Sequence, residues 1–90
     1  MIDPQIRIRH IRCFLETAHL GSLSAAADAL HVSQPAASKT IKELEDILGV
    51  ALFDRSGRRL TLTRAGSLFQ RHAGPAMVDL RRAQDMAQSA

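Results

Sequence analysis

The stretch from residue 22 to residue 48, SLSAAADALHVSQPAASKTIKELEDIL, constrains the fold of this chain most strongly. Its apolar residues recur at helical spacing in two runs, which are separated only by the segment 31–33. Ser22 and Ser33 are suited to cap the two helices, and Pro35 falls in the first turn of the second helix, where its missing N–H costs nothing. The alanines of the first run allow two helices to approach closely. The stretch therefore predicts a helix-turn-helix.

The second of these helices, residues 33–48, combines an apolar stripe with a polar beginning. The stripe is expected to consist of Ala37, Ile41, Leu44 and Leu48. A helix that follows a tight turn and leaves its first turns exposed is able to enter the major groove of duplex DNA and contact base edges there. The predicted DNA contacts of this helix are Ser33, Gln34, Pro35, Ala36, Ser38, Lys39 and Lys42.

Each type of side chain in this set suits a particular part of the duplex. Gln34 offers the paired donor and acceptor that match adenine, and Ser38 reaches either a base or a phosphate. Pro35 and Ala36 offer apolar contact to a thymine methyl group. The capping serine and the helix N-terminus favour a phosphate. The two lysines add positive charge along the groove, which strengthens binding without reading the sequence.

Two short runs after this helix predict a β-hairpin. Residues 52–55 and 59–62 are candidate strands, and residues 56–58 form the turn, with Gly57 able to adopt a positive φ. Arg55, Arg58 and Arg59 make this wing basic, and Arg58 at its tip suits a narrow minor groove. Two roles stay open for Arg55: a phosphate contact, or an ion pair with Glu45 that holds the wing.

A long helix is predicted from residue 64 to about residue 88, with Thr63 as its cap. Its apolar residues step by three or four positions, which gives a heptad-like seam. A domain this small is unable to cover both flanks of such a helix, so one flank is expected to pack on the first helix and the other on a second copy. Gly74 and Pro75 predict a kink without a break. The predicted dimerisation residues are Phe69, His72, Ala76, Leu80 and Ala83.

A further amphipathic helix is predicted before the helix-turn-helix, from about residue 7 to Gly21. Its arginines, Arg9 among them, are expected on a solvated face, and Cys13 is expected to be a small buried hydrophobe. His10 has no partner at metal-ligand spacing in the sequence. The acidic side chains of the later helix are likewise expected to be solvated; they are Glu43, Glu45 and Asp46.

The runs AAADALHVSQPAASKTIKELEDILGVALFDR and RRLTLTRAG resemble the DNA-binding head of the LysR-type transcriptional regulators, over roughly residues 8 to 70. The resemblance implies a mainly α winged helix-turn-helix in residues 1–63, with a three-helix core and a two-stranded β-wing. It also implies that residues 64–90 form a linker helix that dimerises and leads to an effector-binding domain, which is absent here. The same resemblance points to Gln34, Pro35, Ser38, Lys39 and the wing as DNA contacts. The run HVSQPAASKTIKELEDILGV is most similar to the subgroup that controls catabolism of protocatechuate and related aromatic acids.

Composition narrows the remaining classes of function. A formal net charge of +3 and a pI near 10.0 favour a polyanionic partner. The single cysteine excludes an intrachain disulfide and a cysteine metal cluster, and it fits a cytoplasmic protein. No apolar run is long enough for a membrane span. No motif for catalysis, a metal or a cofactor is apparent, so we expect a protein that is not an enzyme and needs no cofactor.

The resulting expectation is the DNA-binding fragment of a sequence-specific transcriptional regulator, bound as a homodimer to double-stranded DNA with an interrupted inverted repeat. A small-molecule inducer is expected to bind only in the missing effector domain. A non-specific nucleoid-type DNA-binding protein is the alternative, because it would also be small, basic and dimeric. It would not need the uncharged face of residues 34–38. A protein-interaction module would explain the last helix but would leave the basic wing without a use.

Overall fold

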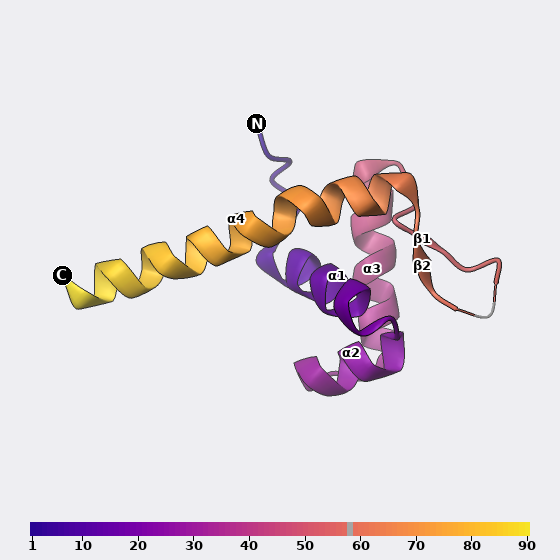
Figure 1. Ribbon diagram of the computed structural model, residues 1–90. Coiled ribbons are helices and arrows are strands. Elements are labelled where there is room, and N and C mark those ends of the chain that lie inside the picture. Colours follow the sequence, from indigo (N-terminus) through magenta and orange to yellow (C-terminus); the bar gives the residue numbers. More distant parts are fainter. Residues whose placement is uncertain (58) are drawn as a thin grey trace.

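The computed structural model describes residues 1–57 and 59–90, and it confirms a mainly α winged helix-turn-helix that continues into a long C-terminal helix (Figure 1). Three helices pack together, a two-stranded hairpin projects from one side, and the last helix packs against α1 before it leaves the domain. The elements in chain order are α1 (Ile8–Leu20), α2 (Leu23–Leu30), α3 (Gln34–Leu48), β1 (Phe53–Asp54), β2 (Thr61–Leu62) and α4 (Arg64–Ser89).

Side chains cap the beginnings of three helices as the sequence predicts. The Ser22 hydroxyl accepts a hydrogen bond from the Ala25 N–H at 3.1 Å, and the Ser33 hydroxyl accepts one from the Ala36 N–H at 3.2 Å. Thr63 does the same for α4. Each cap satisfies a backbone donor that has no partner within its own helix. The boundaries of α2, α3 and α4 therefore follow from local sequence.

The turn between α2 and α3 depends on a left-handed residue that is not glycine. His31 has a φ of 58°. Its N–H donates to the Asp28 carbonyl at 3.2 Å, and the Val32 N–H donates to the Ala27 carbonyl at 3.0 Å. This pair of bonds is the Schellman arrangement that ends many helices, in which glycine usually occupies the left-handed position. It brings Ser33 directly to the start of α3, so the turn is as short as predicted.

An aromatic and aliphatic core joins the three helices to the wing and to α4. Phe14 is completely buried at its centre, with the Phe53 ring 5.3 Å away and the Phe69 ring 5.2 Å away between ring centroids. Small residues at the helix crossings let the backbones approach closely. The buried apolar residues around Phe14 are Cys13, Ala26, Ala27, Ala37, Ile41, Leu44, Leu52 and Phe53.

The wing is shorter than predicted. Its antiparallel register pairs Phe53 with Leu62 and Asp54 with Thr61, so each strand has two residues instead of four. The Asp54 carboxylate accepts hydrogen bonds from the Ser56 N–H and hydroxyl, at 2.9 Å and 2.7 Å, and this turn diverts the chain from the ladder. The same bonds lower the pKa of Asp54. Gly57 does not use left-handed backbone, and the predicted role of Arg58 lies outside the described residues.

The helix α4 is anchored at one end and free at the other. It runs as one helix across Pro75, and the predicted kink stays a prediction. Gly66 in its first turn is buried, and a Cβ atom there would collide with the Leu52 carbonyl oxygen. From residue 78 onward every residue is exposed, and this half extends away from the domain (Figure 1). Among the described residues, no helix is both long enough and apolar enough to cross a membrane.

Candidate nucleic-acid interface

The first turns of α3 form an exposed and largely uncharged surface. Gln34, Pro35 and Ala36 are exposed, as is the capping Ser33, whereas Ala37 is buried against α1 and α2. Gln34 and Ser38 lie four residues apart and therefore on one strip of the helix. Ser38 is half-buried. The structure thus brings the predicted base-reading side chains together at one end of α3, beside the turn that orients them.

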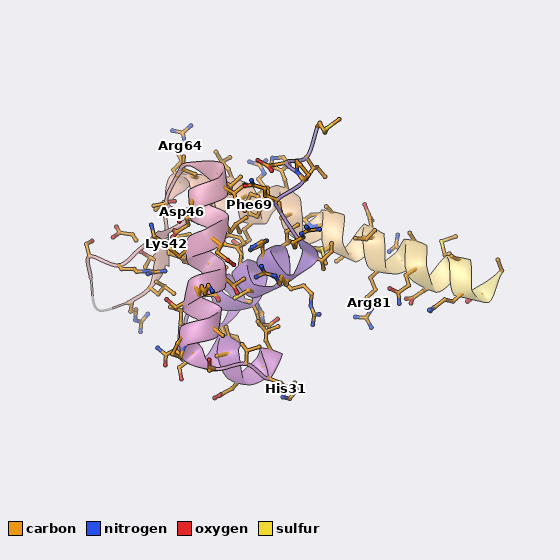
Figure 2. All side chains as sticks on the ribbon, turned by 180° about the vertical axis from the view of Figure 1, so that it is seen from behind. His31, Lys42, Asp46, Arg64, Phe69 and Arg81 are labelled. Carbon is orange, nitrogen blue, oxygen red and sulfur yellow. The ribbon has the colours of Figure 1, made fainter. Side chains whose placement is uncertain are left out.

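The two lysines of α3 continue this surface toward the middle of the helix. Both Lys39 and Lys42 are exposed. The Lys42 ammonium lies 3.1 Å from the Asp46 carboxylate, one turn further along α3 (Figure 2). Both side chains are more than 60% exposed, at 68% and 64%, so the pair is screened by water and holds Lys42 weakly. Lys42 therefore remains able to leave its carboxylate partner for a stronger anion.

Arg55 and Arg59 are exposed on the wing, and the ion pair considered for Arg55 is wrong. Glu45 turns to the backbone instead: its carboxylate Oε2 accepts hydrogen bonds from the Leu52 N–H at 2.7 Å and from the Phe53 N–H at 3.3 Å. These two residues are 1% and 5% exposed, so their N–H groups have little access to water and need a protein acceptor. Arg55 is left available for other contacts.

Arg9 and Glu43 lie on a solvated face as the sequence predicts, with side chains 59% and 38% exposed, but they also contact each other, which the sequence did not predict. Arg9 donates a hydrogen bond to the Glu43 carboxylate at 3.1 Å, which links the start of α1 to the middle of α3. This bond is the main reason why the pKa of Glu43 is lowered. His10 completes the contact: it is 2% exposed, and its Nε2 lies 3.4 Å from the same carboxylate oxygen. Its Nδ1 accepts a hydrogen bond from the Arg7 N–H at 2.9 Å.

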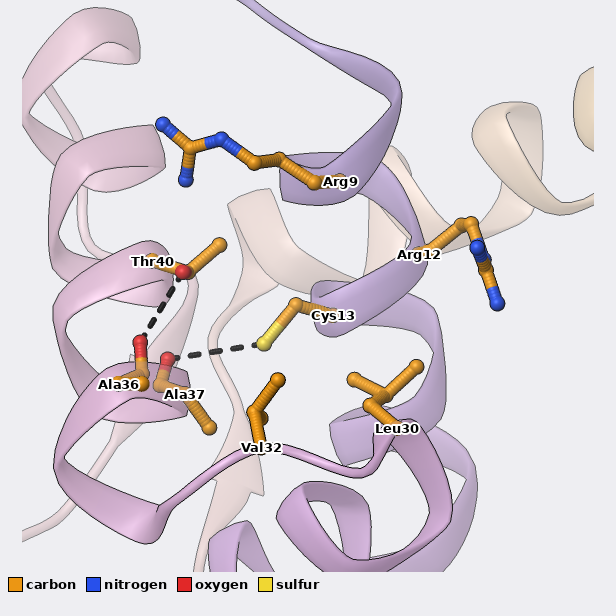
Figure 3. A pocket seen from close by; sticks show the side chains of 8 residues that line it. All are labelled: Arg9, Arg12, Cys13, Leu30, Val32, Ala36, Ala37 and Thr40. Carbon is orange, nitrogen blue, oxygen red and sulfur yellow. Dashed lines mark hydrogen bonds between the residues drawn. The ribbon is translucent and has the colours of Figure 1, made fainter.

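A small pocket of about 190 Å³ lies between α1 and the beginning of α3 (Figure 3). Cys13 is at its base, where the thiol donates a weak hydrogen bond to the Ala37 carbonyl oxygen over 3.5 Å. Figure 3 shows the Arg9 side chain reaching toward α3 and Arg12 pointing away from the pocket. Burial raises the pKa of the Cys13 thiol, and the residue is 3% exposed. Cys13 is therefore the buried hydrophobe that the sequence predicts. Among the described residues, no group of three potential ligands is placed to hold a metal ion.

The predicted dimerisation residues divide into two groups. Phe69 is half-buried and packs edge-on against Phe14, so part of its apolar surface is already covered within one chain. The others are exposed on α4; they are His72, Ala76, Leu80 and Ala83. A groove of about 750 Å³ lies between the N-terminal segment, α1 and the first half of α4. Ile2 also lines this groove and is 78% exposed, and the sequence analysis predicted no role for it.

Comparison with known proteins identifies the class to which this architecture belongs. The family model of the bacterial regulatory helix-turn-helix proteins of the lysR family matches residues 8–67. Two solved structures superpose closely: the BenM DNA-binding domain in complex with benA site 1 DNA, and the CbnR DNA-binding domain in complex with DNA. The first has a TM-score of 0.90 at 30% identity and covers 93% of this chain and 94% of its own. The second has a TM-score of 0.85 at 36% identity and covers 93% and 97%.

The chain therefore belongs to the lysR family of bacterial regulatory helix-turn-helix proteins. Among curated relatives, the HTH-type transcriptional regulator PcaQ of Agrobacterium fabrum is 52% identical over 85 residues, which is 94% of this chain and 27% of PcaQ. The uncharacterized regulator YdcI of Escherichia coli is 42% identical over 73 residues, or 81% of this chain and 24% of YdcI. The chain spans about a quarter of the length of these relatives.

Proposed function

We propose that this chain is the DNA-binding part of a transcriptional regulator and that it recognises a specific duplex sequence as a dimer. The observation that carries the proposal is the exposed, uncharged face at the beginning of α3, formed by Gln34, Pro35 and Ala36 and capped by Ser33. A face built only for phosphates would present basic side chains there, because phosphate contacts are electrostatic. Uncharged donors, acceptors and methyl groups are suited to base edges.

In this proposal, α3 lies in the major groove and the wing lies beside the adjacent minor groove. Gln34 and Ser38 read base edges, and Lys39 and Lys42 contact phosphates. Arg55, Arg58 and Arg59 contribute positive charge from the wing. The two similar domains of BenM and CbnR were solved in complex with DNA, which supports duplex DNA as the partner in this proposal.

The helix α4 joins two copies in the proposed assembly. Its seam of Phe69, His72, Ala76, Leu80 and Ala83 packs against the same helix of a second copy, so the two heads are related by a two-fold axis. Such a dimer requires two half-sites with matching symmetry, which predicts an operator with an interrupted inverted repeat. The groove next to the N-terminal segment is apolar and continuous with this seam.

The longer regulator would divide into a winged helix-turn-helix of residues 1–63, a linker helix from residue 64, and an effector-binding domain outside this sequence. We infer that a small-molecule inducer binds in that further domain. The 52% identity to the HTH-type transcriptional regulator PcaQ supports a close relationship between the two regulators, and the resemblance of the run HVSQPAASKTIKELEDILGV favours the subgroup that controls catabolism of protocatechuate and related aromatic acids. We also infer a binding role without catalysis or a cofactor, and a cytoplasmic location, where bacterial duplex DNA lies.

Selection of binding sites from a random duplex library tests the proposed function. The expected result is an enriched motif with two related half-sites, which the protein binds about 1000-fold or more tightly than unselected duplex at physiological salt. Equal affinity for selected and random DNA would instead indicate a non-specific nucleoid-type DNA-binding protein. No observation on the exposed face of α3 favours that alternative. The relatives matched by sequence are transcriptional regulators, which also argues against that alternative.

A further inference from the structure

The junction between α3 and the wing is built around one carboxylate. Glu45 accepts both the Leu52 N–H at 2.7 Å and the Phe53 N–H at 3.3 Å through the same oxygen, Oε2. Charged acceptors make shorter and stronger hydrogen bonds than neutral ones, and buried donors that lose their acceptor are costly. The first residues of the wing are therefore tied directly to the side of α3.

The Leu52 peptide is also held from the side opposite to Glu45. Its carbonyl oxygen accepts a hydrogen bond from the Thr63 N–H at 3.0 Å, and the Thr63 hydroxyl donates to the Ala51 carbonyl at 2.7 Å. Gly66 packs so closely on the Leu52 carbonyl that no Cβ atom fits between them. The two consecutive peptide groups between Ala51 and Phe53 thus lie between α3 and the start of α4, directly before β1. A movement of the wing relative to α3 has to break these contacts.

The place of Glu45 on α3 relates this junction to the proposed DNA contacts. Gln34, Ser38 and Glu45 follow one another at spacings of four and seven residues, which puts them along one side of the helix. The base-reading side chains and the anchor of the wing therefore share one edge of α3, and the anchor lies at the far end from Gln34. A substitution at Glu45 therefore removes contacts to the start of the wing and leaves every side chain at the beginning of α3 unchanged.

We propose that Glu45 is a positioning residue, which fixes the wing relative to α3 so that both reach the same duplex in register. This inference rests on the proposed function, because it concerns how two DNA-contacting elements are coupled. It assigns no DNA contact to Glu45 itself. With the carboxylate in place, the wing discriminates among sequences that flank the half-site read by α3. Without it, the wing keeps its charge but loses its fixed distance from the recognition helix.

The test compares selected binding motifs for four forms of the protein: wild type, Glu45→Ala, Glu45→Gln and Asp46→Asn. Glu45→Gln retains a neutral acceptor that faces the Leu52 N–H. Asp46→Asn is the matched control, because it removes the same negative charge from the next residue of α3, where the carboxylate is exposed, pairs with Lys42 and is bonded to no backbone group among the described residues of the wing. Because this variant also releases Lys42, which affects overall affinity, the comparison uses the preference among flanking base pairs and not the affinity itself. Folding of each form is followed by thermal melting, and binding is measured well below the lowest melting temperature.

The expected result is that Glu45→Ala loses its sequence preference only at the positions that flank the half-site core of the motif. In wild type and Asp46→Asn, replacing a preferred flanking base pair should weaken binding by roughly 5- to 100-fold, the usual range for one mismatch. In Glu45→Ala the same replacement should change affinity by about twofold or less, while the preference within the half-site core persists. Glu45→Gln should restore most of the flank preference.

Three results would overturn the inference while leaving the proposed function intact. One is an unchanged flank preference in a folded Glu45→Ala variant. Another is a uniform loss of preference at core and flank positions in both Glu45 variants, which indicates a purely structural role. The third is a Glu45→Gln variant that behaves like Glu45→Ala. If wild type itself fails to prefer any selected duplex over random DNA, the proposed function is wrong and this inference is rejected with it.

Discussion

The ring of Phe69 stands edge-on to the ring of Phe14, with centroids 5.2 Å apart and an interplanar angle of 87° (Figure 2 labels Phe69). This contact joins α4 to α1 through the aromatic centre of the core. A residue that the sequence analysis assigned to an interface between copies therefore has a place inside one copy. The first turns of α4 belong to the packed domain, and the boundary at residues 63 and 64 stays a prediction.

Replacing Phe69 with alanine should destabilise the isolated domain by about 2–4 kcal/mol. This loss extends below the range of about 3–5 kcal/mol that is usual for a fully buried phenylalanine, because the side chain is only half-buried, although it also loses one edge-to-face contact. Urea unfolding measures the difference. Leu68→Ala is the control. Because Leu68 is 47% exposed, this substitution should lower the free energy of unfolding by about 1 kcal/mol or less. Equal losses in the two variants would mean that the aromatic contact does not anchor α4.

Replacing Gln34 with alanine should weaken specific DNA binding by about 1–3 kcal/mol and relax the preference at one position of each half-site. Gln34 is exposed at the start of α3, so its removal leaves the core intact. Titration of selected and random duplexes at equal salt separates base reading from phosphate contact. An equal loss on the two kinds of duplex would assign Gln34 to the DNA backbone.

Replacing Leu80 with glutamate should convert the dimer to a monomer while the helix-turn-helix stays folded. Leu80 is 53% exposed on the predicted seam, and a buried charge there would have no partner. Val78→Glu is the matched control, because Val78 is 58% exposed and lies two residues away, on nearly the opposite side of the helix. Analytical ultracentrifugation should give a monomer for the first variant only. A dimeric Leu80→Glu form would show that the interface lies elsewhere.

Replacing His31 with glycine should stabilise the domain by roughly 0.5–1 kcal/mol. The backbone of His31 is left-handed, with a φ of 58°, and glycine adopts this conformation without the steric cost that a Cβ atom brings. The side chain is exposed, so no packing is lost. Ala29→Gly places glycine inside α2 and should destabilise by about 1 kcal/mol. Thermal and urea unfolding of the two variants should thus shift in opposite directions.

The Arg9–Glu43 contact should make the free energy of unfolding depend on pH in the acidic range where the Glu43 carboxylate becomes protonated. The pKa of Glu43 is lowered in the folded protein, chiefly by the hydrogen bond from Arg9, so folding favours the ionised carboxylate. The stabilisation is present above the model-peptide value of 4.5 and disappears as the pH falls through the lower folded value. Urea unfolding of wild type and Glu43→Gln should show a larger difference in the free energy of unfolding at pH 7 than at pH 3. Arg9→Gln should remove most of the same pH dependence.

The sequence by itself determined the features that depend on neighbouring residues. Hydroxyl caps at Ser22, Ser33 and Thr63, together with apolar residues at helical spacing, specify where α2, α3 and α4 begin and which faces they bury. Pro35 fits the first turn of α3 for a reason contained within that turn. The exposed beginning of α3 follows from the same periodicity, which is why most of the candidate interface could be predicted.

Only the tertiary structure decided which of the similar acidic side chains of α3 contact other helices or the wing. Glu43, Glu45 and Asp46 are alike in the sequence, yet Glu43 meets Arg9 of α1 and Glu45 meets two backbone N–H groups of the wing, whereas Asp46 pairs with Lys42 within α3. Arg9 and Glu43 are 34 positions apart, so no local spacing predicts their bond. The hydrogen bonds from Leu52 and Phe53 to Glu45 depend on how the chain returns beside α3 after Gly49. Glu45 accepts from two N–H groups that packing has removed from water, and that burial is a property of the assembled fold.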